Sequence, residues 1–136
     1  MAGDHRLTGF AVPEEIEALH DLLERVGRDH PDLASLDLGL FETAVIEIAN
    51  NVVEHGRPPG AVRWTFGVDV HPDRVVGVLT DDGEALPATV DVGSAVMPGV
   101  EDESGRGLPL ATAVLDELTY GRADGVNVWT MVRRRS

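Results

Sequence analysis

Three polar residues, Glu47, Asn51 and His55, recur at intervals of four along one stretch of the chain. In an α-helix, positions i and i+4 lie one above another on the same face, so these side chains would form a row. The carboxylate can accept a proton, and the amide and the imidazole can hold a metal ion or orient a nucleophile. A solvated polar edge of an amphipathic helix is the alternative interpretation of the row.

A second polar group, Asp81-Asp82-Gly83, directly follows a Val-rich segment that ends at Thr80. A carboxylate at the end of a strand can accept a hydrogen bond from an exocyclic amine, and a glycine beside it lets a flat ring approach the backbone. The alternative is an ordinary turn, which Asp and Gly also favour. The group therefore predicts either a site that recognises a ring or a simple loop.

The third group is Gly105-Arg106-Gly107-Leu108, which precedes an apolar pattern of helical spacing. Glycines leave backbone N–H groups accessible, and the N-terminus of a helix carries a partial positive charge. Together these features predict an anion site, for which a phosphate is the usual ligand. A loop that enters a helix without any ligand is the alternative.

Two helices are predicted ahead of any hairpin. The first begins at Pro13, a residue favoured in the first turn, and ends with Gly27 as its C-cap. The second runs from Leu38 to His55 and stops at Gly56. Apolar residues at helical spacing are expected to face the core, namely Ile16, Leu19, Leu23 and Val26 in the first helix and Phe41, Ala44, Val45, Ile48 and Val52 in the second.

Alternating or Val-rich segments predict four strands. Residues 6–12 form the first, residues 61–70 and 74–80 form a hairpin, and residues 126–133 form the last. Between the hairpin and the last strand, a third helix is predicted from the spacing of Leu108, Ala111, Val114, Leu115 and Leu118.

The segment of about residues 83–107 has no sustained period and is interrupted by Pro and Gly, and we expect it to be a lid over a ligand. The element order has too few long crossovers for a doubly wound parallel sheet. It predicts an α/β (α+β) two-layer sandwich in which three helices cover one face of a mixed, mostly antiparallel sheet. No linker divides residues 1–136, so a single domain is predicted.

The formal net charge is −13, and all eleven basic residues are arginines. Such a charge repels nucleic acids and anionic lipids, so neither is an expected partner. The chain has no cysteine and no apolar run long enough for a membrane span, which favours a cytoplasmic location. The charge would also repel ATP, so a nucleotide site would depend on a metal ion and on backbone N–H groups.

The three polar groups supply complementary parts in a fixed order. Glu-x-x-x-Asn on a helix, Asp-x-Gly after a strand and Gly-x-Gly-Leu at a helix entrance resemble the N, G1 and G2 boxes of the GHKL ATPases, whose histidine kinase-like domain has the Bergerat fold. Within that superfamily, the chain resembles the anti-sigma-factor serine kinases of the RsbW and SpoIIAB type over about residues 10–133. Ala85 departs from the pattern, because many relatives have a second glycine there.

This resemblance implies a role for each box in binding ATP and Mg²⁺. Glu47 would accept the proton of an attacking hydroxyl, Asn51 would coordinate Mg²⁺, and His55 would lie beside the nucleotide. Asp81 would bind the adenine amine, with Gly83 beside the ring and Asn127 as a further contact. The phosphates would be enclosed by the third group, Gly105, Arg106, Gly107 and Leu108.

The resemblance also implies the partners. The chain would be an ATP-dependent serine/threonine-protein kinase that phosphorylates a STAS-type anti-sigma-factor antagonist, sequesters a sigma factor, or does both. Family analogy suggests a homodimer as its assembly. A non-catalytic nucleotide-binding module that controls a partner by contact alone is the main alternative. A histidine kinase catalytic domain and a metal hydrolase built on His55, Glu54 and Asp81 are further alternatives. No phospho-acceptor helix and no metal-ligand spacing supports either of them.

Overall fold

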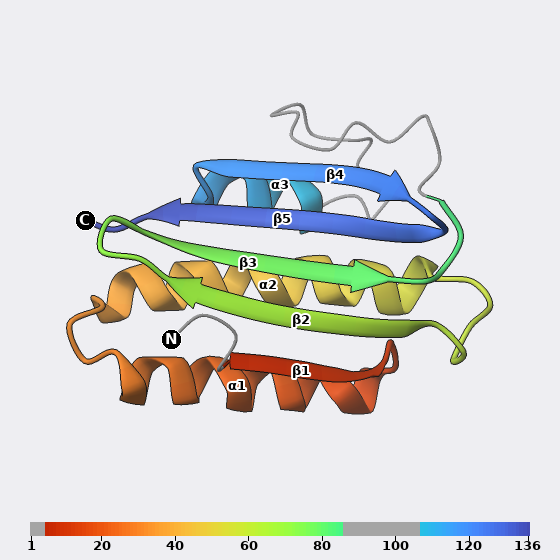
Figure 1. Cartoon of the computed structure of the whole chain (residues 1–136), viewed down its shortest axis with the longest axis horizontal. Helices are drawn as coiled ribbons and strands as arrows, with labels where there is room; N and C mark the ends of the chain where they lie inside the picture. Colours follow the sequence, from red (N-terminus) through yellow and green to blue (C-terminus); the bar gives the residue numbers. More distant parts are fainter. Residues whose placement is uncertain (1–4, 86–106) are drawn as a thin grey trace.

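The structure is a computed structural model of the chain, and it describes residues 5–85 and 107–136. Two long helices follow the first strand, and a hairpin, a third helix and a second hairpin complete the fold (Figure 1). The elements are β1 (His5–Phe10), the 3₁₀ turn η1 (Pro13–Glu15), α1 (Ile16–Asp29), α2 (Ser35–His55), β2 (Arg63–Val70), β3 (Arg74–Asp81), α3 (Gly107–Val114), β4 (Glu117–Ala123) and β5 (Val126–Arg134).

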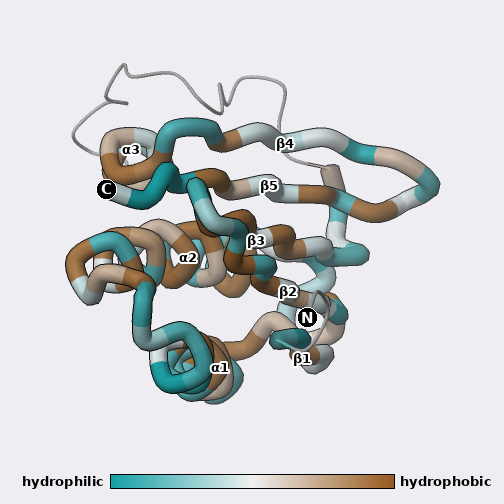
Figure 2. The backbone as a smooth tube through the Cα atoms, turned by 60° about the vertical axis from the view of Figure 1, so that its left-hand side comes forward, coloured by the Kyte–Doolittle hydropathy of each residue, from teal (hydrophilic) through white to brown (hydrophobic). Residues whose placement is uncertain are grey.

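The five strands form one sheet in the order β1-β2-β3-β5-β4, and the three helices lie together on one of its faces (Figures 1 and 2). Each neighbouring pair is antiparallel. The predicted two-layer α+β architecture is therefore confirmed. No parallel pair occurs among the described strands, so the sheet is simpler than the mixed one expected.

The central helix α2 supplies most of the contact between the two layers. Its predicted apolar stripe is buried throughout, from Phe41 to Val52. On the sheet, Trp64 and Phe66 alternate with exposed residues, because successive side chains of a strand point to opposite faces. No helix in the described part of the chain combines the length and the apolar composition needed to cross a lipid bilayer.

The prediction that Gly27 caps the first helix is wrong. Helix α1 continues to Asp29, and His30 follows as its C-cap. The glycine has a packing role instead, because a Cβ atom at position 27 would lie 2.8 Å from Cδ2 of Leu38 on α2. Its lack of a side chain lets the two helices approach closely.

The prediction that the third helix extends to Leu118 is also wrong. Helix α3 ends at Val114, and Leu118 lies on the extra strand β4, opposite Met131 of β5. The turn between these strands is Asp124-Gly125, and both residues have positive φ angles, 54° and 77°. Asp-Gly is a strong signal for a tight hairpin, because its two central residues tolerate that conformation.

A buried carboxylate, Asp37, fixes the start of α2 to the end of β5. It accepts hydrogen bonds from Nε of Arg133 at 3.2 Å and from the backbone N–H and hydroxyl of Ser136 at 2.9 and 2.8 Å. The N–H of Ser136 is the largest cause that lowers the pKa of Asp37; burial opposes the shift, and the Ser136 hydroxyl and Arg133 add to it. This carboxylate is therefore ionised in the folded protein and stabilises it.

One row of residues crosses the sheet near the end of α2. Neighbouring strands place Gly9 opposite Trp64, Trp64 opposite Asp81, Asp81 opposite Asn127 and Asn127 opposite Arg122. Both Asp81 and Asn127 are buried, at 4% and 3% exposure. The strand register therefore brings polar side chains together at one end of an otherwise apolar face.

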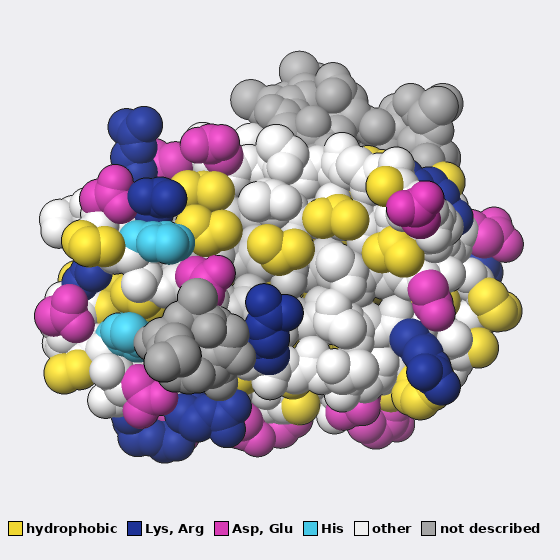
Figure 3. All heavy atoms as spheres, in the orientation of Figure 1, with side chains coloured by type: hydrophobic (Ala, Val, Ile, Leu, Met, Phe, Trp, Pro, Cys, Tyr) yellow, Lys and Arg dark blue, Asp and Glu magenta, His cyan; other side chains and the backbone are white. Residues whose placement is uncertain are grey.

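The other face of the sheet is not covered by any described helix, and Figure 3 looks onto it. Uncharged and apolar side chains occupy most of its centre, among them the exposed Thr65 and Val78, while most charged side chains lie nearer its margins. The buried polar side chains at positions 81 and 127 belong to the helix-covered face, so the candidate site lies between the two layers.

Candidate functional site

Helix α2 contributes Asn51 and His55 to the site. The side chain of Asn51 lies on the buried side of the helix at 8% exposure and lines a cavity. His55 is exposed in the last turn of the same helix. Because both residues line this cavity, they are candidate ligand contacts.

Strand β3 contributes Asp81 at its last position. Its Oδ1 accepts a hydrogen bond from the backbone N–H of Gly83 at 3.1 Å, which closes a short turn. A Cβ atom at position 83 would lie only 3.1 Å from the same Oδ1 and 3.2 Å from Val62. A side chain at position 83 would therefore be crowded by the carboxylate and by Val62.

Strand β5 contributes Asn127, and its amide group is fully engaged. The nitrogen donates to Oδ1 of Asp81 at 2.8 Å and to the carbonyl of Glu84 at 2.9 Å. The oxygen accepts from the hydroxyl of Tyr120 at 2.5 Å and from Nη1 of Arg122 at 2.8 Å. Asn127 thus ties the two strands of the second hairpin to the loop after β3.

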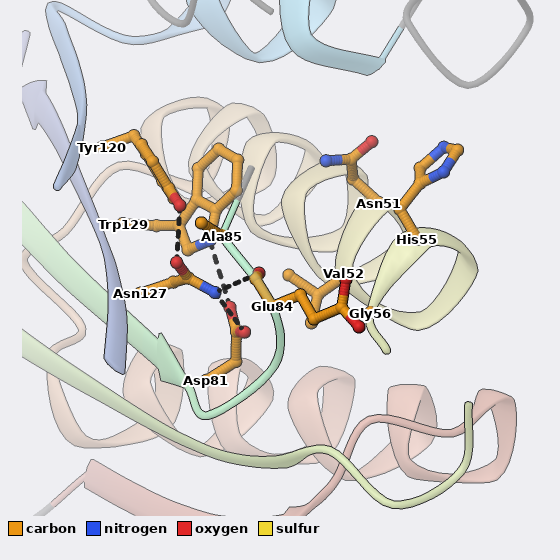
Figure 4. Close-up of a pocket in the computed structure, with 10 residues that line it drawn as sticks. All are labelled: Asn51, Val52, His55, Gly56, Asp81, Glu84, Ala85, Tyr120, Asn127 and Trp129. Carbon is orange, nitrogen blue, oxygen red and sulfur yellow. Dashed lines mark hydrogen bonds between the residues drawn. The ribbon is translucent and has the colours of Figure 1, made fainter. Parts of the chain in front are cut away.

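These residues enclose a small cavity of about 40 Å³ between α2 and the sheet (Figure 4). Tyr120 and Trp129 form an aromatic wall, with ring centroids 4.8 Å apart in an edge-to-face arrangement. The second oxygen of Asp81 accepts a 3.3 Å hydrogen bond from the indole N–H of Trp129. The cavity is lined by Asn51, Val52, His55, Gly56, Asp81, Glu84, Ala85, Tyr120, Asn127 and Trp129.

The cavity is smaller than a purine ring. A volume of about 40 Å³ holds one or two water molecules. Figure 4 shows Glu84 and Ala85 between the helix and the aromatic wall. Movement of these two exposed residues away from Asn51 and His55 would enlarge the cavity for a ring.

Glu47 lies outside that cavity, although the sequence places it one turn before Asn51. It lines a larger cavity of about 300 Å³ between α1 and α2, together with His20 and Glu42. Two of the lining side chains contact each other, with Nδ1 of His20 2.5 Å from Oε2 of Glu42. The structure therefore places the predicted base and the predicted metal ligand on two different cavities along one helix.

In the described residues, no group of three or more His, Asp and Glu side chains is arranged to hold a metal ion. An ion such as Mg²⁺ prefers oxygen ligands and commonly takes only one or two from the protein, with the rest from water and phosphate. The amide oxygen of Asn51, at the cavity, fits that pattern when a phosphate completes the shell. The donor set thus suits an ion that arrives with a phosphorylated ligand.

Residues 11–133 match the sequence profile of the histidine kinase-like ATPase domain. The chain belongs to this family. Membership implies a nucleotide as ligand, and the helix, strand and glycine motifs expected from the sequence lie within the matched region. No curated protein matches the chain.

The histidine kinase-like fold of this chain is also similar to a solved structure. The crystal structure of the RsbU and RsbW domains of Rv1364c from Mycobacterium tuberculosis superposes with a TM-score of 0.61 at 17% identity. The match covers 96% of this chain and 32% of that one, so the chain spans about a third of the length of its structural neighbour. At this identity the similarity establishes the fold.

The ATPase motifs are only partly visible in the structure. Asn51, His55, Asp81 and Asn127 meet at one cavity, with Gly83 in the adjoining turn. Gly107 and Leu108 begin α3, whereas Gly105 and Arg106 lie outside the described residues, as does most of the expected lid.

Sequence reasoning missed three residues of the site. Trp129 and Tyr120 form the aromatic wall, and Arg122 bonds to Asn127. The Asp-Gly turn and the alternation on either side of it were the available signal, because a hairpin there aligns all three side chains with the buried face.

Proposed function

We propose that this chain is an Mg-ATP-dependent serine/threonine-protein kinase that acts as an anti-sigma regulatory factor. Family membership supports the nucleotide. The similarity to a structure that contains an RsbW domain, together with the sequence resemblance to such kinases, supports the regulatory role. The proposal assigns the chemistry to two cavities along α2.

One observation carries the nucleotide site. Asn51, which is 8% exposed, lines the same cavity as Asp81. We assign Asn51 to Mg²⁺, which when bound would neutralise phosphate charge, and His55 to the adjoining part of the nucleotide. The carboxylate of Asp81 accepts a hydrogen bond from the exocyclic amine of adenine, and the amide of Asn127 holds that carboxylate in place.

The phosphates are assigned to the glycine-rich entrance of α3. Backbone N–H groups and the positive end of the helix suit an anion in a protein whose net charge is −13. We assign Gly105, Arg106, Gly107 and Leu108 to this role from the sequence motif. The side chain of Arg106 would supply a cation, because the chain has no lysine.

The acceptor side is assigned to Glu47. A substrate hydroxyl that enters the cavity between α1 and α2 would meet this carboxylate, and its oxygen would attack the γ-phosphorus as ADP leaves and the proton passes to Glu47. Such a transfer requires the hydroxyl to contact both Glu47 and the γ-phosphorus at once. The proposal therefore requires the γ-phosphate to extend from the nucleotide cavity along α2 toward Glu47.

The proposed partners are a STAS-type anti-sigma-factor antagonist, phosphorylated on serine, and a sigma factor, with a homodimer as the assembly. The acidic surface would compete with DNA for basic faces of a sigma factor. Binding to the sigma factor should then weaken steeply between low and moderate salt, because screening acts within about 8 Å at physiological ionic strength. Binding that is insensitive to salt would contradict this part of the proposal.

A phosphotransfer assay with γ-labelled ATP and the antagonist tests the kinase activity. We expect label on the antagonist's serine with the parent protein and a loss of at least about 100-fold with Glu47→Gln, since general bases contribute about 10²–10⁴-fold. Glu54→Gln, an exposed site on the same helix, is the matched control and should retain activity. Equal rates for both variants would remove Glu47 from the mechanism.

The alternative, a non-catalytic nucleotide-binding module that controls its partner by contact alone, is favoured by one observation: Glu47 does not line the cavity that holds Asn51 and Asp81. The same assay separates the two functions. A module that acts by contact alone binds sigma factor or antagonist but transfers no label to the antagonist.

A further inference from the structure

We propose that Arg122 is a positioning residue for base recognition. It fixes the carboxylate of Asp81 through Asn127 and the loop after β3, and so makes the site selective for a purine with an amine, rather than a carbonyl oxygen, at its 6-position. This inference rests on the proposed nucleotide site and adds the residues that set its selectivity. Arg122 belongs to none of the three sequence motifs.

Arg122 reaches the site from β4, the edge strand. It lies directly opposite Asn127 in the strand register. Its Nη1 donates two hydrogen bonds, to Oδ1 of Asn127 at 2.8 Å and to the carbonyl of Gly83 at 2.9 Å. One guanidinium therefore links the outer hairpin to the turn that carries Asp81.

This link fixes the orientation of the Asn127 amide. Its oxygen receives donors from Arg122 and Tyr120, while its nitrogen faces Oδ1 of Asp81 and the carbonyl of Glu84. In the rotated amide, the nitrogen would meet the guanidinium and the oxygen would meet the carboxylate, and both contacts are repulsive. The amide therefore presents its N–H groups to Asp81.

The orientation of Asn127 in turn fixes the carboxylate of Asp81. Its Oδ1 accepts from Asn127 and from the N–H of Gly83, and its Oδ2 accepts a long bond from Trp129. An ionised carboxylate has about four acceptor positions, so Oδ2 keeps capacity for one more donor. Adenine offers an amine donor to that position, whereas guanine offers a carbonyl oxygen, which the carboxylate repels.

Removal of the guanidinium should loosen this arrangement. The carbonyl of Gly83 and the oxygen of Asn127 each lose a charged donor, and hydrogen bonds to charged groups are the stronger ones. The turn and the Asp81 carboxylate then sample more orientations, and the distinction between the two purines weakens. The fold should tolerate the change, because Arg122 is exposed on an edge strand.

The first test compares the dissociation constants of Mg-ATP and Mg-GTP by calorimetry. For the parent we expect a clear preference for ATP, and for Arg122→Ala a loss of about 10-fold in that preference, the size expected for a charged hydrogen bond. Arg122→Lys should restore part of it. Arg134→Ala, at the exposed opposite end of β5, removes the same charge and should leave the preference unchanged.

The second test uses the nucleotide-free protein. The chain has two tryptophans, Trp64 and Trp129, so two indole N–H signals are expected in an NMR spectrum. Because the indole of Trp129 bonds to Asp81, its signal should shift in Arg122→Ala and stay in place in Arg134→Ala. Trp64→Phe assigns the two signals.

The outcomes separate this inference from the function it rests on. A parent that binds neither nucleotide overturns both. A parent that prefers ATP, with the preference and the Trp129 signal unchanged in Arg122→Ala, overturns the role of Arg122 alone. An equal loss of preference in Arg134→Ala would show a general charge effect and would also overturn it.

Discussion

Replacement of Asp81 by asparagine tests the base-recognition geometry most sharply. The substitution preserves the shape of the side chain and allows one oxygen to keep its bonds to Gly83 and Asn127. It places an amide nitrogen where Oδ2 now meets the N–H of Trp129 at 3.3 Å. Two donors then face each other in a buried site, and the exocyclic amine of adenine loses its acceptor.

The expected magnitudes follow from these contacts. A buried N–H without a partner costs about 1–3 kcal/mol, and Tm falls by about 3–5 °C per kcal/mol in a domain of this size. Separately from this loss of folding stability, loss of the charge-assisted hydrogen bond to the base should weaken the free energy of ATP binding by about 1.5–3 kcal/mol, or about 10- to 150-fold in Kd. GTP binding should not fall, because the new amide nitrogen can donate to the guanine oxygen.

Calorimetry with both nucleotides and a thermal melt of the free protein measure these effects. The control is Asp82→Asn, which removes the same charge from the neighbouring exposed residue; its Oδ1 accepts a bond from the backbone N–H of Arg63. An Asp81→Asn protein that binds ATP as tightly as the parent would refute the assignment of this carboxylate to the base.

Two further predictions concern stability. A Cβ atom at position 77 would lie 2.7 Å from Cζ of Phe41, so Gly77→Ala should destabilise the fold by about 1–3 kcal/mol. At position 121 an added Cβ atom would have no atom within 4 Å, so Gly121→Ala should change the free energy of unfolding by less than about 0.5 kcal/mol. Equal melting temperatures for both variants would contradict the close packing at position 77. Asp37→Asn should destabilise by about 2–3 kcal/mol at pH 7. Folding lowers the pKa of Asp37, so the stability that its charge contributes is present above the pKa of the unfolded chain, about 3.9, and is lost as the pH falls further. The difference in unfolding free energy between parent and variant, measured by denaturant unfolding, should therefore shrink below about pH 4. A difference that does not depend on pH would contradict the role of the charge.

The fold could be predicted from the sequence wherever a regular period coincided with a buried face. The stripe of α2 and the alternation of β2 are of this kind, because each buries one complete side of its element. The prediction failed between Val114 and Leu118, where three apolar residues continued the helical spacing by coincidence. The Asp-Gly turn that follows was the stronger local signal, because positive φ angles restrict which residues can occupy it.

For the candidate site, the sequence predicted the positions of residues that share one helix or end one strand, but not contacts that depend on how separate elements pack. Asn51 and His55 share a helix face, and Asp81 ends a strand, so their meeting follows from the fold. The contact of Arg122 with Asn127 depends on the register of a strand that the periodicity missed. The separation of Glu47 from the nucleotide cavity was likewise hidden, because it depends on how α1 packs against α2.

The central claim is that a triphosphate and its cation bind beside the amide of Asn51. A thermal-shift titration with Mg-ATP, Mg-ADP and ATP in EDTA, on the parent and on Asn51→Ala, tests it most directly. We predict that Mg-ATP at about 100 times its Kd stabilises the parent by roughly 2.7 kcal/mol, that EDTA removes most of this effect, and that the variant melts normally but gains little from Mg-ATP. Equal stabilisation of parent and variant, or no stabilisation of the parent by any of these ligands, would contradict the claim.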